Sequence, residues 1–247
     1  MRFKIEFETE NEESFLIPYN YAHIVASVIY QSISKIDPDS EIHSSTSFKF
    51  FTFSQLRFNK FKTVDKGILS KDGKVSLQIS SPNNELLKKI MQGFLKDSHI
   101  EILNIKLKIT NITMIKEPIF QEKMEFKTIS PIIANTRTLI DGKKKEWDLS
   151  PSDPEFYPFI TRNLLKKYNE YYNTDYDEDL IKISSNLRFV KRKRISMKAN
   201  EAKQHHVGYL MNITLEGHPN LIKFAYDCGL SNKNSMGFGM LEPVKRN

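Results

Sequence analysis

The sequence has 247 residues, enough for one large domain or two small ones, and its formal net charge is +7. This basic balance favours a polyanionic partner, either nucleic acid or an anionic membrane surface. A single cysteine, Cys228, excludes an internal disulfide framework and a cysteine-rich zinc site. The acidic start does not resemble a signal peptide, and the apolar runs are far shorter than the ~20 residues that span a bilayer. We therefore expect a cytoplasmic protein with no membrane segment.

The first half of the chain predicts the order strand, helix, strand, strand, helix, strand. Apolar and charged residues alternate over 2–8, as in a half-buried strand. Pro18 is a favoured first residue of a helix, and an apolar stripe with 3.6-residue spacing runs from Ala22 to Ile33. The elements expected next are strands at 48–56 and 73–80, a helix at 83–96 and a strand at 100–115. The alternation of this last strand changes phase at Leu103-Asn104, which indicates a β-bulge.

The second half repeats this order with insertions. The expected elements are a strand at 122–129, a charged turn at 142–145, a helix at 154–172, strands at 180–190 and 205–215, a short helix at 219–228 and a last strand that includes Phe238 and Met240. Gly229 is a natural stop for the short helix. The order in each half is that of the ferredoxin-like βαββαβ unit, which is also the scaffold of RNA-recognition modules. The predicted fold is α+β, with two tandem ferredoxin-like domains at 1–117 and 118–247.

The strongest local motif is a glycine-rich loop near the C-terminus. A helix ends, a polar stretch follows, and Gly237-Phe238-Gly239 leads into a strand. Glycine lets a backbone approach phosphate closely, and the polar side chains can donate to phosphate oxygens. The candidate RNA-binding residues of the loop are Gly229, Asn232, Lys233, Asn234, Ser235, Gly237 and Gly239. An ordinary helix-to-strand turn with a capping glycine explains the bare pattern equally well.

A second signal is a run of cations around Phe189. Clustered cations beside a predicted strand suit a track of RNA phosphates. The candidate RNA-binding residues of this basic segment are Arg188, Lys191, Arg192, Lys193, Arg194 and Lys198. The alternative is a solvated basic hairpin. His205 and His206 are adjacent, and side chains that follow one another on a strand point to opposite faces, so we expect no metal site there.

The glycine-rich loop resembles the C-terminal signature of the RAMP superfamily of CRISPR proteins. Ser231 departs from that signature, because a glycine is usual at its position. Four further segments, together with the opening MRFKIEF, resemble the CRISPR repeat-processing endoribonucleases within the superfamily and cover both halves of the chain. They are 17–20, 130–132, 155–157 and 234–240.

The resemblance implies three catalytic residues: Tyr30 late in the first helix, His43 just after it and Lys49 six residues further on. Cleavage of RNA without a metal requires a deprotonated 2′-hydroxyl, a protonated 5′-oxygen and a stabilised phosphorane. Histidine, with a pKa near ~6.5, suits the acid role at the leaving oxygen, and lysine suits the charge on phosphate. Tyr30 would act at the 2′-hydroxyl, which a tyrosine can orient or deprotonate, although a pKa of ~10 makes it a poor base unless shifted. The division of roles between Tyr30 and His43 is a hypothesis.

Each of the three residues has a plainer interpretation when taken alone. Tyr30 borders an apolar helix face and suits the edge of a core. His43 lies in a polar loop and suits solvent, and Lys49 begins an aromatic strand from which it would extend to solvent. Only their joint spacing within the resemblance favours catalysis.

The sequence therefore predicts a metal-independent endoribonuclease that needs no cofactor and cleaves CRISPR repeat RNA, the precursor of crRNA. The expected products carry a 5′-hydroxyl and a 2′,3′-cyclic phosphate. The first domain would supply catalysis and the second would bind RNA. One alternative is a non-catalytic RNA-binding subunit of a CRISPR interference complex, and another is a structural or regulatory module. A homodimer and contacts with other CRISPR-associated proteins stay open.

Overall fold

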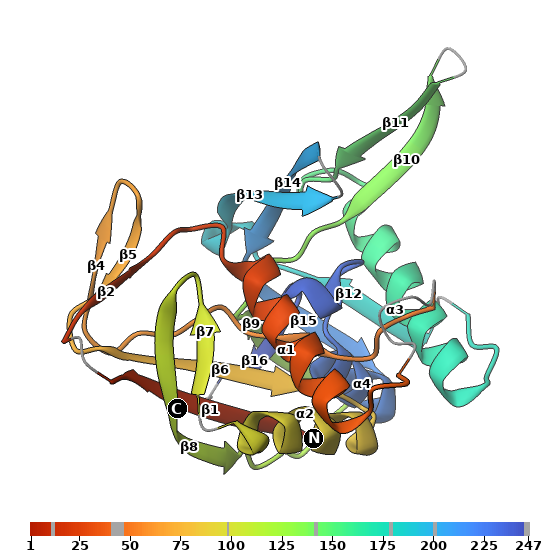
Figure 1. Ribbon diagram of the computed structural model, residues 1–247. Coiled ribbons are helices and arrows are strands. Elements are labelled where there is room, and N and C mark those ends of the chain that lie inside the picture. Colours follow the sequence, from red (N-terminus) through yellow and green to blue (C-terminus); the bar gives the residue numbers. More distant parts are fainter. Residues whose placement is uncertain are drawn as a thin grey trace.

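The computed structural model describes residues 1–10, 13–40, 47–97, 99–140, 143–177, 180–199 and 202–244. It shows two α+β domains side by side (Figure 1). The first contains a five-stranded antiparallel sheet in the order β3-β6-β1-β8-β7. Its elements are β1 (Arg2–Thr9), α1 (Ala22–Ile36), β3 (Thr52–Phe53), β6 (Lys74–Ser80), α2 (Asn84–Lys96), β7 (His99–Ile102) and β8 (Ile105–Met114). The alternation read in β1 is confirmed, because Phe3, Ile5 and Phe7 are buried against the helices.

The second domain repeats the topology of the first. Its main sheet has the antiparallel order β12-β15-β9-β16, which matches β3-β6-β1-β8 strand for strand. Its elements are β9 (Lys123–Thr128), α3 (Phe156–Tyr172), β12 (Ile181–Ser184), β15 (Asn212–Gly217), α4 (Pro219–Cys228) and β16 (Leu241–Pro243). The predicted pair of ferredoxin-like domains is confirmed, since the chain order in each half gives the same sheet.

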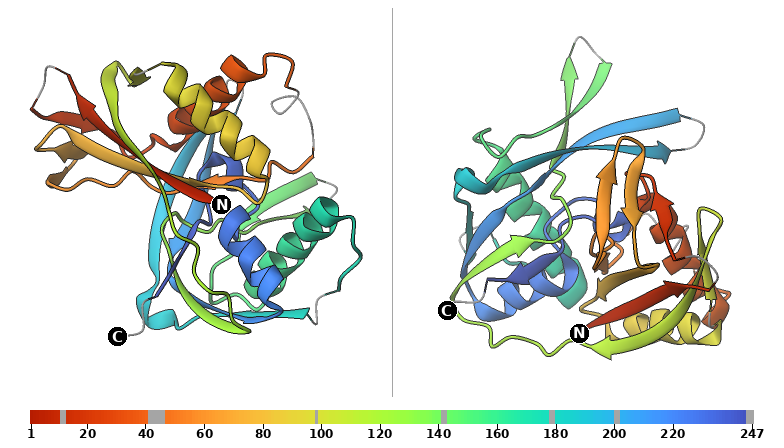
Figure 2. Two further views of the ribbon diagram at one scale, coloured as in Figure 1. Left: turned by 90° about the horizontal axis from the view of Figure 1, so that it is seen from below. Right: turned by 90° about the vertical axis from the view of Figure 1, so that its left-hand side faces the viewer.

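Three insertions project from this frame. The first domain carries a small sheet in the order β2-β5-β4, built from β2 (Phe15–Ile17), β4 (Phe61–Val64) and β5 (Gly67–Ser70). The second carries the hairpin of β10 (Asn135–Ile140) with β11 (Lys143–Asp148), and the hairpin of β13 (Lys191–Ala199) with β14 (Ala202–Leu210). All three extend away from the two main sheets (Figure 2).

Two local predictions about the first domain are wrong. Helix α1 begins at Ala22, not at Pro18, because the chain stays extended through Ile17, which pairs with Ile68 of β5. Leu103 and Asn104 do not form a bulge. Both have positive φ, 52° and 67°, and they form the tight turn of the hairpin β7–β8.

Several predicted strands are shorter than expected. The strand at 48–56 reduces to β3, the strand at 180–190 ends at Ser184, and Phe238 and Met240 precede β16 instead of lying in it. The strand at 205–215 divides at Met211, whose N–H donates to Thr128 Oγ1 instead of continuing one ladder. The predicted turn at 142–145 is also wrong in part, because 143–145 belong to β11.

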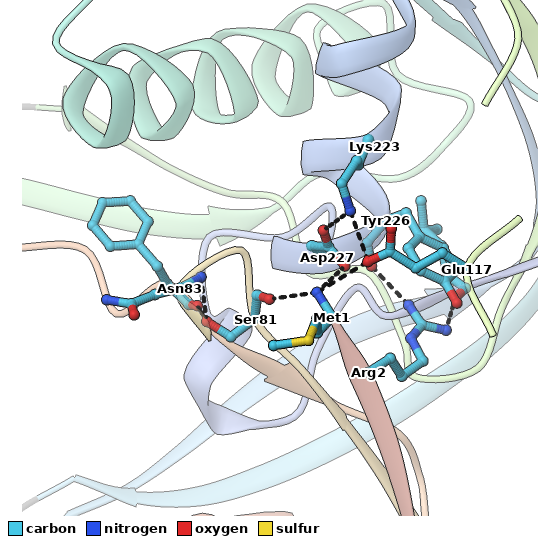
Figure 3. Close-up of polar contacts among 10 residues, drawn as sticks. Met1, Arg2, Ser81, Asn83, Glu117, Lys223, Tyr226 and Asp227 are labelled. Carbon is cyan, nitrogen blue, oxygen red and sulfur yellow. Dashed lines mark hydrogen bonds and ion pairs between the residues drawn. The ribbon is translucent and has the colours of Figure 1, made fainter. Parts of the chain in front are cut away.

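Arg2 joins the two domains at the start of the chain. Its side chain is 1% exposed, donates from Nη1 to Leu241 O at 2.6 Å and from Nη2 to Tyr226 O at 2.7 Å, and lies over the Tyr226 ring (Figure 3). Burial lowers the pKa of Arg2 to about 10, so the guanidinium stays charged at neutral pH. Beside it, the Met1 amino group contacts Asp227 at 3.2 Å. Strand β1 is thus tied to α4 and β16 by charge-assisted hydrogen bonds.

Candidate active site and RNA-binding surfaces

The glycine-rich loop, residues 229–239, lies at the boundary between the two domains. It connects α4 to β16, and its 3-10 turn η3 (Asn234–Met236) contacts α1 and β3 of the first domain. Thr52 Oγ1 of β3 donates to Phe238 O at 2.9 Å, and this bond is buried. The motif that the sequence singled out is therefore packed into an interface and is not a free surface loop.

The glycines of this loop are required by packing. Gly229, Gly237 and Gly239 have φ of +87°, +85° and +77°, a region that favours glycine. A Cβ at Gly237 would lie 2.3 Å from the Phe53 ring, and one at Gly239 would lie 2.5 Å from the Leu230 carbonyl carbon. Of the predicted RNA-binding residues in the loop, the half-buried ones are Asn232, Lys233 and Ser235, and the buried ones are Gly229, Asn234, Gly237 and Gly239.

Ser231, the departure from the family signature, forms its own contacts with the second domain. Its hydroxyl donates to Ile133 O at 3.0 Å and accepts from Ile133 N at 3.2 Å. The side chain is 1% exposed. A glycine at this position would lack both bonds, so the serine fixes the loop to the neighbouring 129–134 segment.

Lys167 lies beneath the loop and is a functional candidate that the sequence analysis missed. Its side chain is 2% exposed, and Nζ donates to Gly229 O at 3.0 Å, Ser231 O at 3.2 Å and Asn234 Oδ1 at 2.6 Å. Burial lowers the pKa of this ammonium. A signal was present in the sequence, because Lys167 falls on the apolar stripe of the helix that also contains Leu164.

Tyr30 lies on α1 and faces the loop. It is 8% exposed, packs edge-on against Phe51 at 5.6 Å between ring centroids, and belongs to the helix that contacts η3. Burial raises the pKa of Tyr30, and the nearby side chain of Ser235 in η3 acts in the opposite direction. The structure thus brings one predicted catalytic residue together with one predicted RNA-binding residue, across the domain boundary.

Lys49 lies in the extended segment before β3 and is half-buried. Its Nζ donates to Ser47 O at 3.1 Å. Burial lowers the pKa of Lys49, and the nearby carboxylate of Glu170 on α3 acts to raise it. His43, the third predicted catalytic residue, lies outside the described residues.

The basic segment is divided between a short turn and a hairpin strand. Arg188 belongs to the 3-10 turn η2 (Leu187–Phe189), and Lys191 to Arg194 lie on β13. Lys191, Arg192 and Arg194 are exposed, whereas Lys193 is half-buried. Burial, with Lys191 nearby, lowers the pKa of Lys193. Lys198 is on the same strand, in the part of the hairpin whose side chains are not described.

A cleft of about 560 Å³ opens between this hairpin, the small β2-β5-β4 sheet and the glycine-rich loop. Of the predicted RNA-binding residues, Lys191, Lys193, Arg194 and Gly237 line it. The lining also includes Tyr19 and Phe61, which are 47% and 54% exposed. A cleft lined by both cations and exposed aromatic rings suits single-stranded nucleic acid, because cations bind the phosphates and aromatic rings stack with the bases. Neither aromatic residue was predicted to bind RNA, since the small sheet was not predicted, although Tyr19 lies in the segment 17–20 that carries part of the resemblance.

The outer face of the first domain's sheet has a different character. It presents paired charges, with Lys4 2.6 Å from Glu6, and Glu6 accepting from Asn111. The aromatic residues of β1, Phe3 and Phe7, point to the opposite face and are buried. This sheet therefore lacks the exposed aromatic rings with which RNA-recognition modules stack bases.

The two adjacent histidines point in opposite directions, as predicted. His206 is buried and contacts Asp148 Oδ1 at 3.1 Å, whereas His205 is exposed and contacts Ser196 Oγ. Within the described ranges, no group of three or more His, Cys, Asp or Glu side chains could hold a metal ion. No helix in those ranges is long and apolar enough to cross a membrane.

Two protein-family models match the chain in succession. The family described as "CRISPR-associated protein Cas6, N-terminal" matches residues 16–113, and "CRISPR associated protein Cas6, C-terminal" matches residues 115–243. Together they span most of both ferredoxin-like domains.

Individual relatives agree with these matches. "CRISPR-associated endoribonuclease Cas6 1" of Methanocaldococcus jannaschii is 34% identical, over 99% of this chain and 93% of the relative. "CRISPR-associated endoribonuclease Cas6" of Pyrococcus furiosus is 26% identical, over 98% and 89%. Among solved structures, "CRISPR associated protein Cas6" has a TM-score of 0.83 at 35% identity and 99% coverage of both chains. "An RAMP protein binding different RNA substrates" has a TM-score of 0.87 at 27% identity, with 99% and 100% coverage.

Proposed function

The chain belongs to the Cas6 family of CRISPR-associated proteins and is an endoribonuclease, and from this premise we propose that it cuts CRISPR repeat RNA within the precursor of crRNA. One observation carries the proposal: the 3-10 turn η3 of the glycine-rich loop contacts α1, the helix that bears Tyr30. A loop suited to RNA and a helix with a catalytic candidate thus share one site. We also propose that residues 1–117 supply catalysis and residues 118–247 bind RNA, in the cytoplasm.

The proposed reaction is attack of the 2′-hydroxyl on the neighbouring phosphate, without a metal ion. The oxygen–phosphorus bond that forms closes a 2′,3′-cyclic phosphate, and the bond to the 5′-oxygen breaks. His43 would protonate the leaving oxygen, since imidazole titrates near neutral pH. Lys49 would stabilise the charge on the non-bridging oxygens.

Tyr30 would act at the 2′-hydroxyl chiefly by hydrogen bonding, and the proton that this hydroxyl loses on attack would pass to solvent. To act as a general base, Tyr30 would first have to lose its own hydroxyl proton, and burial raises its pKa further above neutrality. Its packing against Phe51, with the side chain of Ser235 nearby, restricts the direction of the hydroxyl. These contacts support a role in orienting the nucleophile.

RNA would enter through the cleft beside β13. Lys191, Lys193 and Arg194 would contact phosphates, and the exposed rings of Tyr19 and Phe61 would stack with unpaired bases. Asn232 and Lys233 of the loop are half-buried, so they retain exposed surface for further phosphate contacts. The RNA path would then run from the basic hairpin over the loop to Tyr30.

The direct test is cleavage of a labelled repeat RNA in the presence of EDTA. We expect a single cut by the wild type, none in RNA with a 2′-deoxy nucleotide at the scissile position, and cleavage by His43→Ala slowed by about 10²- to 10⁴-fold. Binding without cleavage by the wild type would contradict the proposal and indicate a non-catalytic RNA-binding subunit. If the wild type cut the RNA without EDTA but not with it, the metal-free chemistry would be contradicted.

A further inference from the structure

The segment that carries Lys49 rests on the second domain, although it belongs to the first. The ring of Phe50 packs with the core of the second domain and meets Tyr171 of α3 edge-on, at 5.0 Å between centroids. The backbone carbonyl of Phe50 accepts a hydrogen bond from Ser81 Oγ of the first domain at 2.5 Å. The backbone next to Lys49 is therefore fixed by contacts with both domains.

Glu170 precedes Tyr171 on α3 and contacts the same segment. Its Oε1 accepts from the Phe48 backbone N–H at 3.4 Å, and its charge acts on the Lys49 ammonium. Glu170 itself is exposed. One carboxylate thus interacts with the residue before Lys49 through its backbone, and with Lys49 through its charge.

We propose that Glu170 positions Lys49 for the reaction, across the boundary between the two domains. This inference rests on the proposed function, because it takes Lys49 as the group that stabilises the phosphorane. A lysine side chain has many rotamers, and ordering it in the free enzyme removes a cost that the transition state would otherwise bear. Glu170 acts through Lys49 and does not contact RNA.

The charge of Glu170 distinguishes this role from RNA binding. A carboxylate near a phosphate site repels the polyanion, so its removal should leave affinity unchanged or increase it. A positioning role predicts that removal of the charge slows cleavage, because Lys49 would be less ordered at the bound phosphate. Measuring the dissociation constant and the cleavage rate separately therefore distinguishes the two roles.

The experiment compares wild type, Glu170→Gln, Lys49→Ala and the double variant in single-turnover cleavage of repeat RNA, with dissociation constants measured on 2′-deoxy RNA. For Glu170→Gln we expect cleavage at saturating enzyme to slow by about 3- to 30-fold, with no loss of affinity. The double variant should match Lys49→Ala within about twofold, because Glu170 has nothing to position once the ammonium is gone. Glu155→Gln is the control, since Glu155 is an exposed glutamate at the other end of the same helix.

Three results would overturn the inference. Weaker binding by Glu170→Gln at an unchanged rate would make Glu170 part of the RNA-binding surface. Independent, multiplying effects of the two substitutions would show that Glu170 does not act through Lys49. If the wild type cuts but Lys49→Ala cuts equally fast, the role of Lys49 fails and the inference fails with it. A wild type that does not cut repeat RNA would instead refute the proposed function itself.

Discussion

The glycine-rich loop and the hairpin β13–β14 were both predicted to bind RNA, yet they are built in opposite ways. The loop is packed against Phe53 and lies over the buried ammonium of Lys167. The hairpin pairs mainly with itself and presents Lys191 and Arg192 to solvent. Substitutions in the loop should therefore change stability and active-site geometry together, whereas substitutions of hairpin cations should change affinity alone.

The largest effect is expected for Gly239→Ala in the loop. The new Cβ would lie 2.5 Å from the Leu230 carbonyl carbon, at a φ of +77°. Backbone strain and overpacking of this kind each cost about 1–3 kcal/mol. We expect the free energy of unfolding to fall by about 3 kcal/mol or more in urea titrations, with cleavage impaired through the displaced Ser235.

The control for this substitution is Asn232→Ala in the same loop. Asn232 is half-buried, and its side-chain amide donates only a long bond of 3.5 Å to Asn135 O. The free energy of unfolding of Asn232→Ala should stay within about 0.5 kcal/mol of the wild-type value. Equal stability of Gly239→Ala and the wild type would show that the glycines do not serve packing.

Replacement of the buried cation by Lys167→Met should have the next largest effect. Three acceptors would lose their donor, which costs about 1–3 kcal/mol. A pH dependence should accompany the loss. Because burial lowers the pKa of Lys167, the unfolded chain binds the proton more tightly, and the stability of the wild type should rise as pH increases towards 10.5.

The measurement is urea unfolding of wild type and Lys167→Met at several pH values from 7 upward. The difference in unfolding free energy between the two should grow with pH, because only the wild type contains the titrating ammonium. A difference that stays constant would mean that the ammonium of the folded protein titrates as it does in the unfolded chain.

The two buried cations also show where sequence reasoning stops. The apolar alternation of β1 and the helical stripes predicted both ferredoxin-like domains, because core-facing residues repeat with the period of the element. The same reasoning placed Arg2 on an exposed face and did not single out Lys167. Their acceptors, such as Leu241 O and Gly229 O, are more than 60 residues away. Nothing local in the sequence indicates a partner at that distance.

The insertions were missed for a different reason. The strands β4 and β5 are short, and Phe61 is exposed, so the periodic burial that signals a strand is absent. The turn at Leu103-Asn104 contains no glycine, the usual mark of a tight hairpin. As a result, the sequence predicted the cations of the cleft but not its aromatic wall. It identified Tyr30 and Lys49 through the resemblance, but it did not single out Glu170, whose charge acts on Lys49.

A smaller effect is expected for Asp148 of β11, which binds this strand to the hairpin β13–β14. Asp148 accepts from Val207 N at 2.7 Å and contacts His206 at 3.1 Å. Burial alone would raise the pKa of Asp148, but these hydrogen bonds hold it below its usual value. Asp148→Asn should cost about 1–2 kcal/mol at pH 7. A carboxylate with a depressed pKa stabilises the fold above its unfolded pKa and loses this effect as pH falls through the folded value.

The difference in stability between wild type and Asp148→Asn should therefore shrink as pH falls below about 4. Chemical denaturation at pH 7, 5 and 3.5 measures it. A cost that is the same at every pH would assign the effect to the lost geometry of the amide and not to the charge of the carboxylate.

The smallest effect on stability is expected for Arg194→Ala, which tests the prediction that the cations of the hairpin β13–β14 affect only the affinity for RNA. Arg194 lines the cleft on β13, and loss of one phosphate contact should weaken repeat RNA binding by about 3- to 10-fold, with stability unchanged. The slope of the logarithm of the binding constant against that of the salt concentration should become shallower by about 1.

The control is Lys106→Ala on β8. It removes a cation that does not line the cleft, so the slope for this variant should equal that of the wild type. If both substitutions shift the slope equally, net charge alone attracts the RNA. In that case the cleft has no specific role, and the hairpin differs from the rest of the basic surface only in its shape.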